Sequence, residues 1–278
     1  MNVKAIMREF GIRPSKRLGQ HFLIDESPLY SMLEAAELKE DDGVLEIGPG
    51  LGVLTLKLAS RAGKVVAVEK DPALLPALEK LAARHKNICL INEDVLKLNL
   101  EQIAKEYFDG KFKVVANLPY YITSPIIMKI VENRHFIEMA VIMVQKEVAE
   151  RLSASPGTRD FGILSVAVQL YAEVDLVCRV SKSAFLPPPK VESAVVRLKL
   201  RENPAVDVED EKVFFRVVEA AFGERRKTVK NSLASRLSLP SDGIREALKK
   251  AGIDENRRAE TLRIEEFAAL SREIAKML

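Results

Sequence analysis

Short apolar runs alternate with longer amphipathic stretches in the first half of the chain. The apolar runs of strand length fall at 44–47, 65–68, 88–91 and 112–116. The stretches between them, such as 53–61 and 72–85, carry apolar residues at helical spacing. Alternation of strands and helices is typical of a parallel sheet covered by helices on both faces, so the pattern predicts an α/β fold.

The second half of the chain continues this pattern and then changes. Segments 137–144, 174–180 and 193–200 are predicted strands, and 163–168 is an apolar segment compatible with a helix. Asn203-Pro204 interrupts the pattern, and after it apolar residues repeat only at helical spacing. We therefore predict an α/β domain over residues 1–204, with a basic arm near its N-terminus, and a small helical domain over 205–278.

Three glycines, Gly48, Gly50 and Gly52, stand between the first predicted strand and the helix that follows it. Glycines at alternate positions let a backbone turn approach a ligand closely, and the start of a helix offers unpaired N–H groups. A tight turn without a ligand accounts for the same residues. The spacing differs from the G-x-G-x-x-G of dinucleotide-binding loops.

Three acidic residues, Glu46, Glu69 and Asp94, stand at the ends of three successive predicted strands. A single acid there is common as a helix cap, but the carboxyl ends of parallel strands meet at one sheet edge. Three carboxylates would repel the phosphates of a dinucleotide, whereas S-adenosylmethionine carries a sulfonium and an ammonium cation. We therefore predict S-adenosylmethionine, with Glu46 at its methionine end, Glu69 at its ribose and Asp94 at its adenine amine.

The fourth predicted strand ends in Asn117-Leu118-Pro119-Tyr120, an ordered and non-helical turn at the same sheet edge. If the Asn117 side-chain oxygen and a carbonyl of Leu118 or Pro119 accept hydrogen bonds from an aromatic amine, its nitrogen can direct a lone pair at the methyl group. Tyr120 is expected to stack on the base. No strong general base is required, because the proton becomes acidic after attack.

Composition sets only wide limits. Lys+Arg 43 against Asp+Glu 40 gives a net charge of +3, so only local clusters bear on nucleic-acid binding. One cluster is Lys16-Arg17 in the basic arm, and another is Arg225-Arg226-Lys227 in the helical domain. Each of these two clusters has two explanations: it contacts RNA phosphates, or it is a solvated surface. With 3 histidines in the chain, we predict no metal site.

The N-terminal segment and the apolar runs bear on localisation. No run reaches the length of a membrane span, and the chain starts without a signal-peptide core. Residues 1–10 form an amphipathic pattern that includes Glu9 and is short for an organellar presequence. We expect a cytoplasmic protein without membrane association. No sequence feature bears on oligomeric state, and a monomer is the working expectation.

Several segments taken together resemble the ribosomal RNA adenine dimethyltransferases of the KsgA type, which act on the small subunit. The matching segments are KRLGQHFL at 16–23, residues 46–55, Asp94, NLPY at 117–120, FLPPPKVES at 185–193 and AFGERRKT at 221–228. They span nearly the whole chain in order. One position departs from the family pattern, because His21 stands where asparagine is frequent. The resemblance therefore implies a backbone contact there and leaves a side-chain contact open.

The resemblance implies a Rossmann-like class I S-adenosylmethionine-dependent methyltransferase fold with a small all-helical C-terminal domain. The donor contacts that it implies are at His21, Leu23, Gly48, Glu69, Asp94 and Asn117. It also implies that Phe185 faces Tyr120 across the target adenine, although the apolar flanks of Phe185 by themselves favour a core residue. The prolines at 187–189 cannot join a central strand and are compatible with a loop over the pocket.

The implied activity is dimethylation of the exocyclic amines of two adjacent adenines in the 3′-terminal hairpin of 16S rRNA in the 30S subunit, which contributes to small-subunit biogenesis. The alternatives are a large-subunit rRNA adenine methylase of the resistance type, a ribosome-assembly or transcription factor on the same fold, and a nicotinamide dehydrogenase. The Pro-rich segment and the helical tail favour the small subunit. The intact Asn117-Leu118-Pro119-Tyr120 favours an active enzyme.

Overall fold

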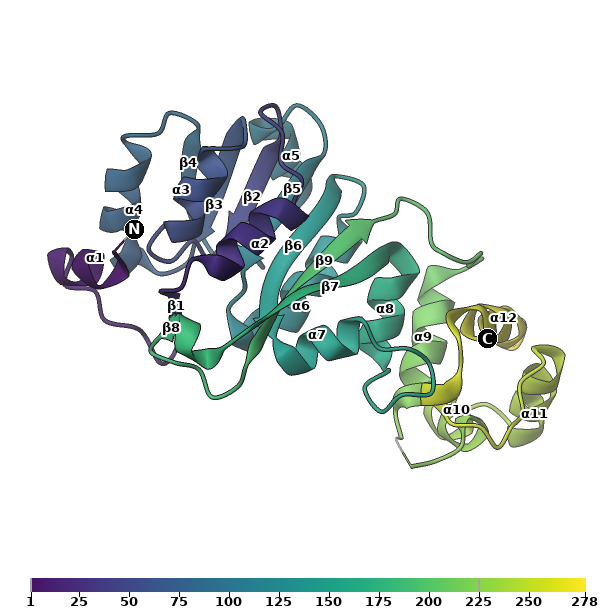
Figure 1. The fold of residues 1–278 in the computed structure, drawn as a ribbon. Coiled ribbons are helices and arrows are strands. Elements are labelled where there is room, and N and C mark those ends of the chain that lie inside the picture. The colour runs from purple at the N-terminus through teal and green to yellow at the C-terminus, as the bar shows by residue number, and fades with distance from the viewer. Residues whose placement is uncertain (1, 225) are drawn as a thin grey trace. The chain divides into compact units, whose positions relative to one another are not determined.

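The chain divides into two compact units in a computed structural model that describes residues 2–224 and 226–278 (Figure 1). The sheet unit consists of Met1–Ala149 and Glu173–Glu202, and the helical unit of Glu150–Ala172 and Asn203–Leu278. Residues 150–172, which the sequence pattern groups with the sheet, belong to the helical unit because the helix at their end packs against the first helix after Asn203. The functional boundary at 204/205 stays a prediction.

A mixed sheet of seven strands forms the centre of the sheet unit within the described residues, in the order β4-β3-β2-β5-β6-β9-β7. Its strands are β2 (Gly43–Ile47), β3 (Lys64–Glu69), β4 (Ile88–Asn92), β5 (Phe112–Asn117), β6 (Ile137–Gln145), β7 (Ala172–Val180) and β9 (Ser193–Leu200). The first five pair in parallel, as the pattern predicts, whereas β9 runs antiparallel to β6.

Helices cover both faces of this sheet (Figure 1). They are α2 (Ser27–Ala35), α3 (Val53–Ala59), the 3-10 turn η1 (Pro72–Leu74) with α4 (Leu75–Ala82), α5 (Leu100–Tyr107) and α6 (Thr123–Glu132). Consecutive residues of β3, Val65 to Val68, are all buried, which requires side chains packed on both faces. The sequence pattern predicts α3 and α4 but does not resolve α5 and α6.

Side-chain caps explain where several helices begin. Asn99 accepts hydrogen bonds from the N–H groups of Glu101 (2.9 Å) and Gln102 (3.2 Å) at the start of α5. Asp71 accepts one from Ala73 N–H at 3.1 Å, and Pro72 occupies the first position of η1. Both arrangements satisfy backbone donors that have no partner inside the helix.

A second, two-stranded sheet joins the N-terminal arm to the Pro-rich segment. It pairs β1 (Phe22–Leu23) with β8 (Phe185–Leu186) in antiparallel fashion, directly after the 3-10 turn η3 (Lys182–Ala184). Leu23 pairs with Phe185, and both side chains lie in a hydrophobic core with Leu29 and Met32 of α2. The sequence pattern does not predict this sheet, because two-residue strands carry no detectable alternation.

The amphipathic N-terminal segment forms α1 (Val3–Glu9), which docks on the sheet unit. Val3 and the nearby Ile12 are buried in a hydrophobic cluster with Leu74 and Leu78 of η1 and α4. Glu9 forms an ion pair with Lys80 of α4. This docking fixes the start of the basic arm beside the sheet. Across the described residues, every helix is too short or too polar to span a membrane.

The helical unit packs its helices around an apolar core of its own. Its elements are the end of α7 (Lys146–Leu152), α8 (Ile163–Tyr171), α9 (Glu211–Phe222), α10 (Val229–Leu237), α11 (Ser241–Lys250), η4 (Ala259–Thr261) and α12 (Ile264–Ala275). Phe214, Leu233, Leu248 and Phe267 are fully buried there, one from each of the four longest C-terminal helices. The predicted helical character after residue 207 is therefore confirmed.

Candidate active site

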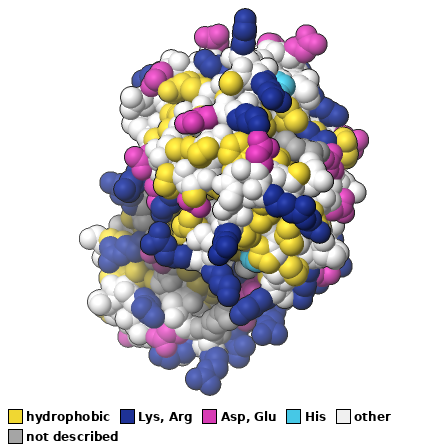
Figure 2. Space-filling view, turned by 90° about the vertical axis from the view of Figure 1, so that its left-hand side faces the viewer, with side chains coloured by type: hydrophobic (Ala, Val, Ile, Leu, Met, Phe, Trp, Pro, Cys, Tyr) yellow, Lys and Arg dark blue, Asp and Glu magenta, His cyan; other side chains and the backbone are white. Residues whose placement is uncertain are grey.

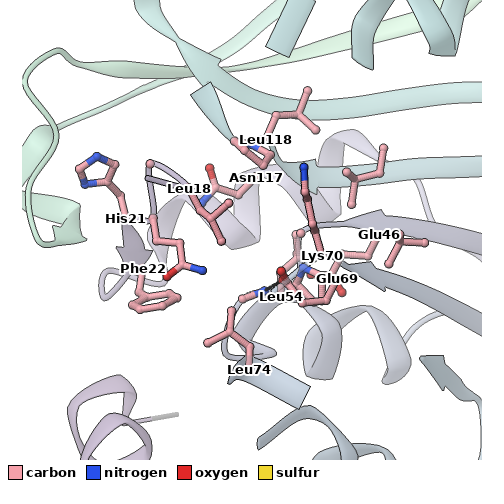
Figure 3. A pocket seen from close by; sticks show the side chains of 18 of the residues that line it. Leu18, His21, Phe22, Glu46, Leu54, Glu69, Lys70, Leu74, Asn117 and Leu118 are labelled. Carbon is pink, nitrogen blue, oxygen red and sulfur yellow. Dashed lines mark hydrogen bonds between the residues drawn. The ribbon is translucent and has the colours of Figure 1, made fainter. Parts of the chain in front are cut away.

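A pocket lies at the carboxyl ends of β2, β3 and β5, entirely within the sheet unit (Figure 3). Residues of the basic arm, the glycine loop, the three acidic strand ends and the turn after β5 line it. The predicted site residues in its wall are His21, Leu23, Glu46, Gly48, Gly50, Glu69, Asp94, Asn117 and Tyr120. The fold thus gathers segments that are up to a hundred residues apart in the chain.

The glycine loop needs glycine for its own backbone. Gly48, Gly50 and Gly52 have φ angles of 68°, 60° and 79°, which residues with a Cβ atom rarely adopt. A Cβ atom on Gly52 would also lie 2.8 Å from Leu81 Cδ1. The tight-turn explanation therefore holds for these residues, and the loop additionally presents its backbone to the pocket.

Glu69 is the last residue of β3 and is 7% exposed. Two backbone N–H groups hold its carboxylate in a fixed orientation. Its Oε2 accepts a hydrogen bond from Gly50 N–H at 3.2 Å, and its Oε1 accepts one from Asp71 N–H at 2.8 Å. Burial raises the pKa of Glu69, and the two N–H groups oppose that rise. Each oxygen keeps a second lone pair, so the carboxylate can accept from the two hydroxyls of a ribose.

Glu46 lies deeper, behind the glycine loop, and is 1% exposed. Burial, together with the nearby charge of Glu69, raises the pKa of Glu46 to about 8, and the neighbouring Thr55 hydroxyl opposes this rise. Among the described residues, the Oε2 atom of Glu46 has no hydrogen-bond partner. A buried carboxyl with a free acceptor fits a ligand that brings an ammonium group to the pocket.

Asp94 shares its carboxylate with a residue that the sequence pattern does not single out. Its Oδ2 accepts a hydrogen bond from Lys70 Nζ at 2.7 Å, and its Oδ1 accepts one from Leu96 N–H at 3.0 Å. The lysine partner holds the pKa of Asp94 below its usual range. An adenine amine bound at Asp94 would therefore share the carboxylate with Lys70 at the rim of the pocket.

The turn after β5 is fixed from both sides. Asn117 ends the strand and its side chain lies in the pocket wall (Figure 3). Leu118 N–H donates to Met143 O of β6 at 3.0 Å. The Pro119 carbonyl already accepts from Thr123 Oγ1 (3.0 Å) and from Ile122 N–H (3.3 Å). Of the two predicted backbone acceptors, the Pro119 carbonyl is therefore already engaged, which favours the Leu118 carbonyl.

Tyr120, in the 3-10 turn η2 (Tyr120–Ile122), is held at both ends of its side chain. Its hydroxyl lies 2.5 Å from Ser193 Oγ, and its ring stacks on His21 with centroids 5.8 Å apart and an interplanar angle of 29°. The His21 Nδ1 is 2.7 Å from the Pro187 carbonyl, which only accepts, so Nδ1 carries a hydrogen. The His21 ring points away from the pocket centre (Figure 3), which is compatible with a backbone contact to the donor.

Phe185 differs from its expected position. The side chain is 2% exposed and packs in the core of the sheet unit, and it is absent from the described wall of the pocket. The reason is the pairing of β8 with β1, which sets Phe185 opposite Leu23. A stacking role would require the side chain to leave this core, and that role stays a prediction.

The predicted RNA-binding cations lie in both units. Lys16 and Arg17 are exposed in the arm of the sheet unit, and Arg226 and Lys227 are exposed in the helical unit. Lys227 pairs with Glu224 at 2.7 Å. Arg225 lies outside the described residues. On the face shown in Figure 2, basic side chains are numerous and acidic ones lie among them, as the small net charge implies.

The parallel strand order, the glycine loop after β2 and the acids at the next strand ends together define a class I methyltransferase fold. The family description "Ribosomal RNA adenine dimethylase" matches residues 12–276 of the chain. The chain belongs to this ribosomal RNA adenine dimethylase family.

Relatives and solved structures agree with this assignment. The chain is 48% identical over 274 residues to "Ribosomal RNA small subunit methyltransferase A" of Alkaliphilus metalliredigens, covering 98% of this chain and 96% of the relative. It is 50% identical over 277 residues to the protein of the same name from Pelotomaculum thermopropionicum, covering 97% and 94%. A dimethyladenosine transferase from Plasmodium falciparum aligns with a TM-score of 0.77 at 28% identity, over 92% of this chain and 98% of that one. The 23S rRNA methyltransferase ErmE aligns at 0.69 and 32%, over 91% and 99%.

Proposed function

We propose that this protein uses S-adenosylmethionine to dimethylate the exocyclic amines of two adjacent adenines in the 3′-terminal hairpin of 16S rRNA. The observation that carries the proposal is the convergence of Glu46, Glu69 and Asp94 with the turn at Asn117–Tyr120 on one pocket. Its support from the comparisons is the shared name of the small-subunit relatives at 48% and 50% identity.

The donor supplies, when bound, a methyl group on a positively charged sulfur. Glu46 would hold the ammonium of the donor's methionine end, and Glu69 would accept hydrogen bonds from the ribose hydroxyls. Asp94 would accept one from the donor's adenine amine. This set of acceptors selects a cationic ligand over one with phosphates, because a carboxylate repels a phosphate at close range.

The target amine is positioned by the turn after β5. In the first transfer the Asn117 side-chain oxygen and the Leu118 carbonyl would accept hydrogen bonds from the two N–H groups of the amine, and in the second transfer one of them would accept from the single N–H that remains. The nitrogen then directs its lone pair toward the donor's methyl group, and cleavage of the methyl–sulfur bond leaves the donor as a neutral thioether. Tyr120, held by Ser193 and His21, presents a flat ring to the base. Orientation by preorganised acceptors supplies the catalysis, and the proton leaves to solvent after the transfer.

A large-subunit target is the alternative within the same chemistry. The likeness to ErmE, at 32% identity, is weaker than that to the small-subunit relatives at 48% and 50%. We therefore prefer the small subunit, and we propose further that the protein is a cytoplasmic monomer that acts on 30S particles and contributes to their biogenesis.

The test uses the whole protein with labelled donor and three substrates: unmethylated 30S particles, naked 16S rRNA and 50S particles. We expect label on two adjacent adenines near the 3′ end of 16S rRNA, mapped by primer extension, and more label on 30S particles than on naked RNA. Asn117→Ala is the control for background methylation. Label on 23S rRNA, or none on any substrate, would contradict the proposal.

A further inference from the structure

The basic arm closes on itself into a small loop at residues 15–20, here called the arm loop. Gln20 N–H donates to Ser15 O at 3.1 Å, and Ser15 N–H donates back to the Gln20 Oε1 at 2.8 Å. Gly19 N–H donates to Lys16 O at 3.2 Å. The Gln20 side-chain oxygen is thus occupied in closing the loop, which leaves its amide group for another partner.

That amide group joins the arm loop to the end of β3. The Gln20 Nε2 donates to Asp71 Oδ2 at 2.7 Å in a partly buried position. Asp71 in turn donates its backbone N–H to Glu69 Oε1 at 2.8 Å, and its Oδ1 caps η1 through Ala73 N–H. Two bonds therefore connect the arm loop with the carboxylate that faces the ribose.

Neither partner needs this bond for its local structure. Gln20 closes the arm loop with its backbone and Oε1, and Asp71 caps η1 with Oδ1. The bond between Nε2 and Oδ2 serves only to join two segments that both contribute to the pocket. A hydrogen bond to a charged acceptor is among the stronger ones, so its loss is measurable.

The arm loop bears on both substrates of the proposed reaction. Lys16 and Arg17, the cations predicted to contact RNA, lie in it and are exposed. His21 and Leu23, the predicted donor contacts, follow it directly and line the pocket. Small displacements of groups that position a substrate reduce catalysis strongly. We therefore expect the conformation of the arm loop to matter for both substrates.

We propose that Gln20 is a positioning residue, whose hydrogen bond to Asp71 holds the arm loop in the conformation that the donor pocket requires. This role rests on the proposed donor. Because the bond links the arm loop to Glu69, donor binding and arm order stabilise each other to the same degree, as linkage demands.

The first measurement compares donor binding by calorimetry in the wild type, Gln20→Ala and a matched control. We expect Gln20→Ala to weaken S-adenosylmethionine binding by about threefold to thirtyfold. This range assumes that only part of the free energy of a hydrogen bond to a charged acceptor is transmitted to the donor site. The donor KM should rise by a similar factor, while kcat at saturating donor stays within about twofold. Gln169→Ala is the control, because the Gln169 amide donates to Leu152 O (2.9 Å) and Ala154 O (2.8 Å) within the helical unit.

A swap of donor and acceptor separates positioning from general damage. Gln20→Glu keeps an acceptor for Ser15 N–H but sets two carboxylates against each other, and Asp71→Asn keeps the η1 cap but turns an amide donor toward Gln20. Each single variant should bind the donor more weakly than the wild type. The double variant reverses the direction of the hydrogen bond and should return to within about threefold of wild-type affinity.

Trypsin digestion supplies a readout that needs no donor. Cleavage after Lys16 and Arg17 should be faster in Gln20→Ala than in the wild type and in Gln169→Ala, at similar midpoints of thermal unfolding. Added donor should slow cleavage in the wild type more than in Gln20→Ala.

Two results would overturn the inference: wild-type donor affinity in Gln20→Ala, or a double variant no better than the two single variants. If the wild type itself fails to bind S-adenosylmethionine, the proposed donor is wrong, and the trypsin comparison then decides the role of the bond on its own.

Discussion

Glu46 makes both stability and donor binding depend on pH. Its pKa rises from an ordinary 4.5 to about 8 in the folded protein. Below pH 4.5 the carboxyl is protonated in the folded and unfolded states alike, and its stabilising contribution is complete. Between 4.5 and 8 the unfolded chain releases a proton that the folded protein keeps, so the free energy of unfolding falls as the pH rises. We therefore expect a total loss on the order of 5 kcal/mol between pH 4.5 and pH 8.

The donor reverses this preference, because an ammonium group beside Glu46 favours the ionised carboxylate. Binding below pH 8 therefore requires Glu46 to release a proton. The Kd of the donor should rise about tenfold for each unit by which the pH falls from 8 to 6. Calorimetry in phosphate and Tris buffers, whose protonation enthalpies differ, should detect release of about one proton at pH 7. The value of kcat at saturating donor should stay flat over this range, because no general base titrates.

Glu46→Gln tests the assignment directly. The variant should bind the donor more weakly at pH 8, release fewer protons on binding than the wild type, and show a weaker pH dependence of its thermal unfolding between 5.5 and 8.5. Glu101→Gln, an exposed position in α5, is the control and should behave as the wild type. A wild-type Kd that is constant from pH 6 to 8, without proton release, would refute the role of Glu46.

Three further predictions concern the other parts of the site. Glu69→Ala should weaken donor binding in calorimetry by about ten- to a hundredfold, because two ribose hydroxyls lose a charged acceptor, and unchanged affinity would remove Glu69 from the site. Asn117→Ala should reduce turnover by about 100- to 1,000-fold with a smaller loss of donor affinity, and Asn117→Asp should retain more activity; wild-type turnover in the alanine variant would exclude the orientation mechanism. Replacing Arg226 and Lys227 by alanine should lower the salt dependence of RNA binding by at most about one log–log unit for each phosphate that the variant no longer neutralises, and an unchanged slope would identify a solvated surface.

The strands of the donor-binding half were predictable because they are short and apolar; β3 is buried, and β4, at the edge of the sheet, is partly buried. β3 extends the run at 65–68 by one residue at each end, and β4 extends the run at 88–91 by one residue at its C-terminal end. In contrast, α5 carries its cap at Asn99 but too few apolar residues to mark its length, with only Leu100, Ile103 and Ala104 buried. The β1–β8 sheet depends on pairing between segments far apart in the chain, which no local pattern encodes.

The acids of the site were predictable for a topological reason. Parallel strands bring their carboxyl ends to one edge, so an acid at the end of each strand is enough to place Glu46, Glu69 and Asp94 together. The residues that bond to these acids or to the neighbouring Asp71 were not predictable in this way. Lys70 and Gln20 act through side-chain bonds to Asp94 and Asp71, and neither residue type is unusual in a loop.

Phe185 shows a case where the sequence pattern favours the core whereas the family resemblance implies a place in the pocket. Its apolar flanks favour the core and the following prolines favour a loop over the pocket. The structure has both features: the ring is buried, while the Pro187 carbonyl that follows contacts His21 beside Tyr120. The segment therefore reaches the site through its backbone, which sequence alone does not indicate.

Burial of the carboxyl groups of Glu46 and Glu69 destabilises their ionised forms in the empty pocket, and it also makes the pocket selective for a cationic ligand. Burial raises the pKa values of both Glu46 and Glu69, and the charge of Glu69 further disfavours ionisation of Glu46. A ligand with positive charge near Glu46 removes that penalty, whereas one with a phosphate at the glycine loop would increase it. Selectivity for a cationic donor thus follows from placing carboxylates in a poorly solvated pocket, and donor binding should raise thermal stability most where Glu46 would otherwise be ionised, at pH values near and above 8.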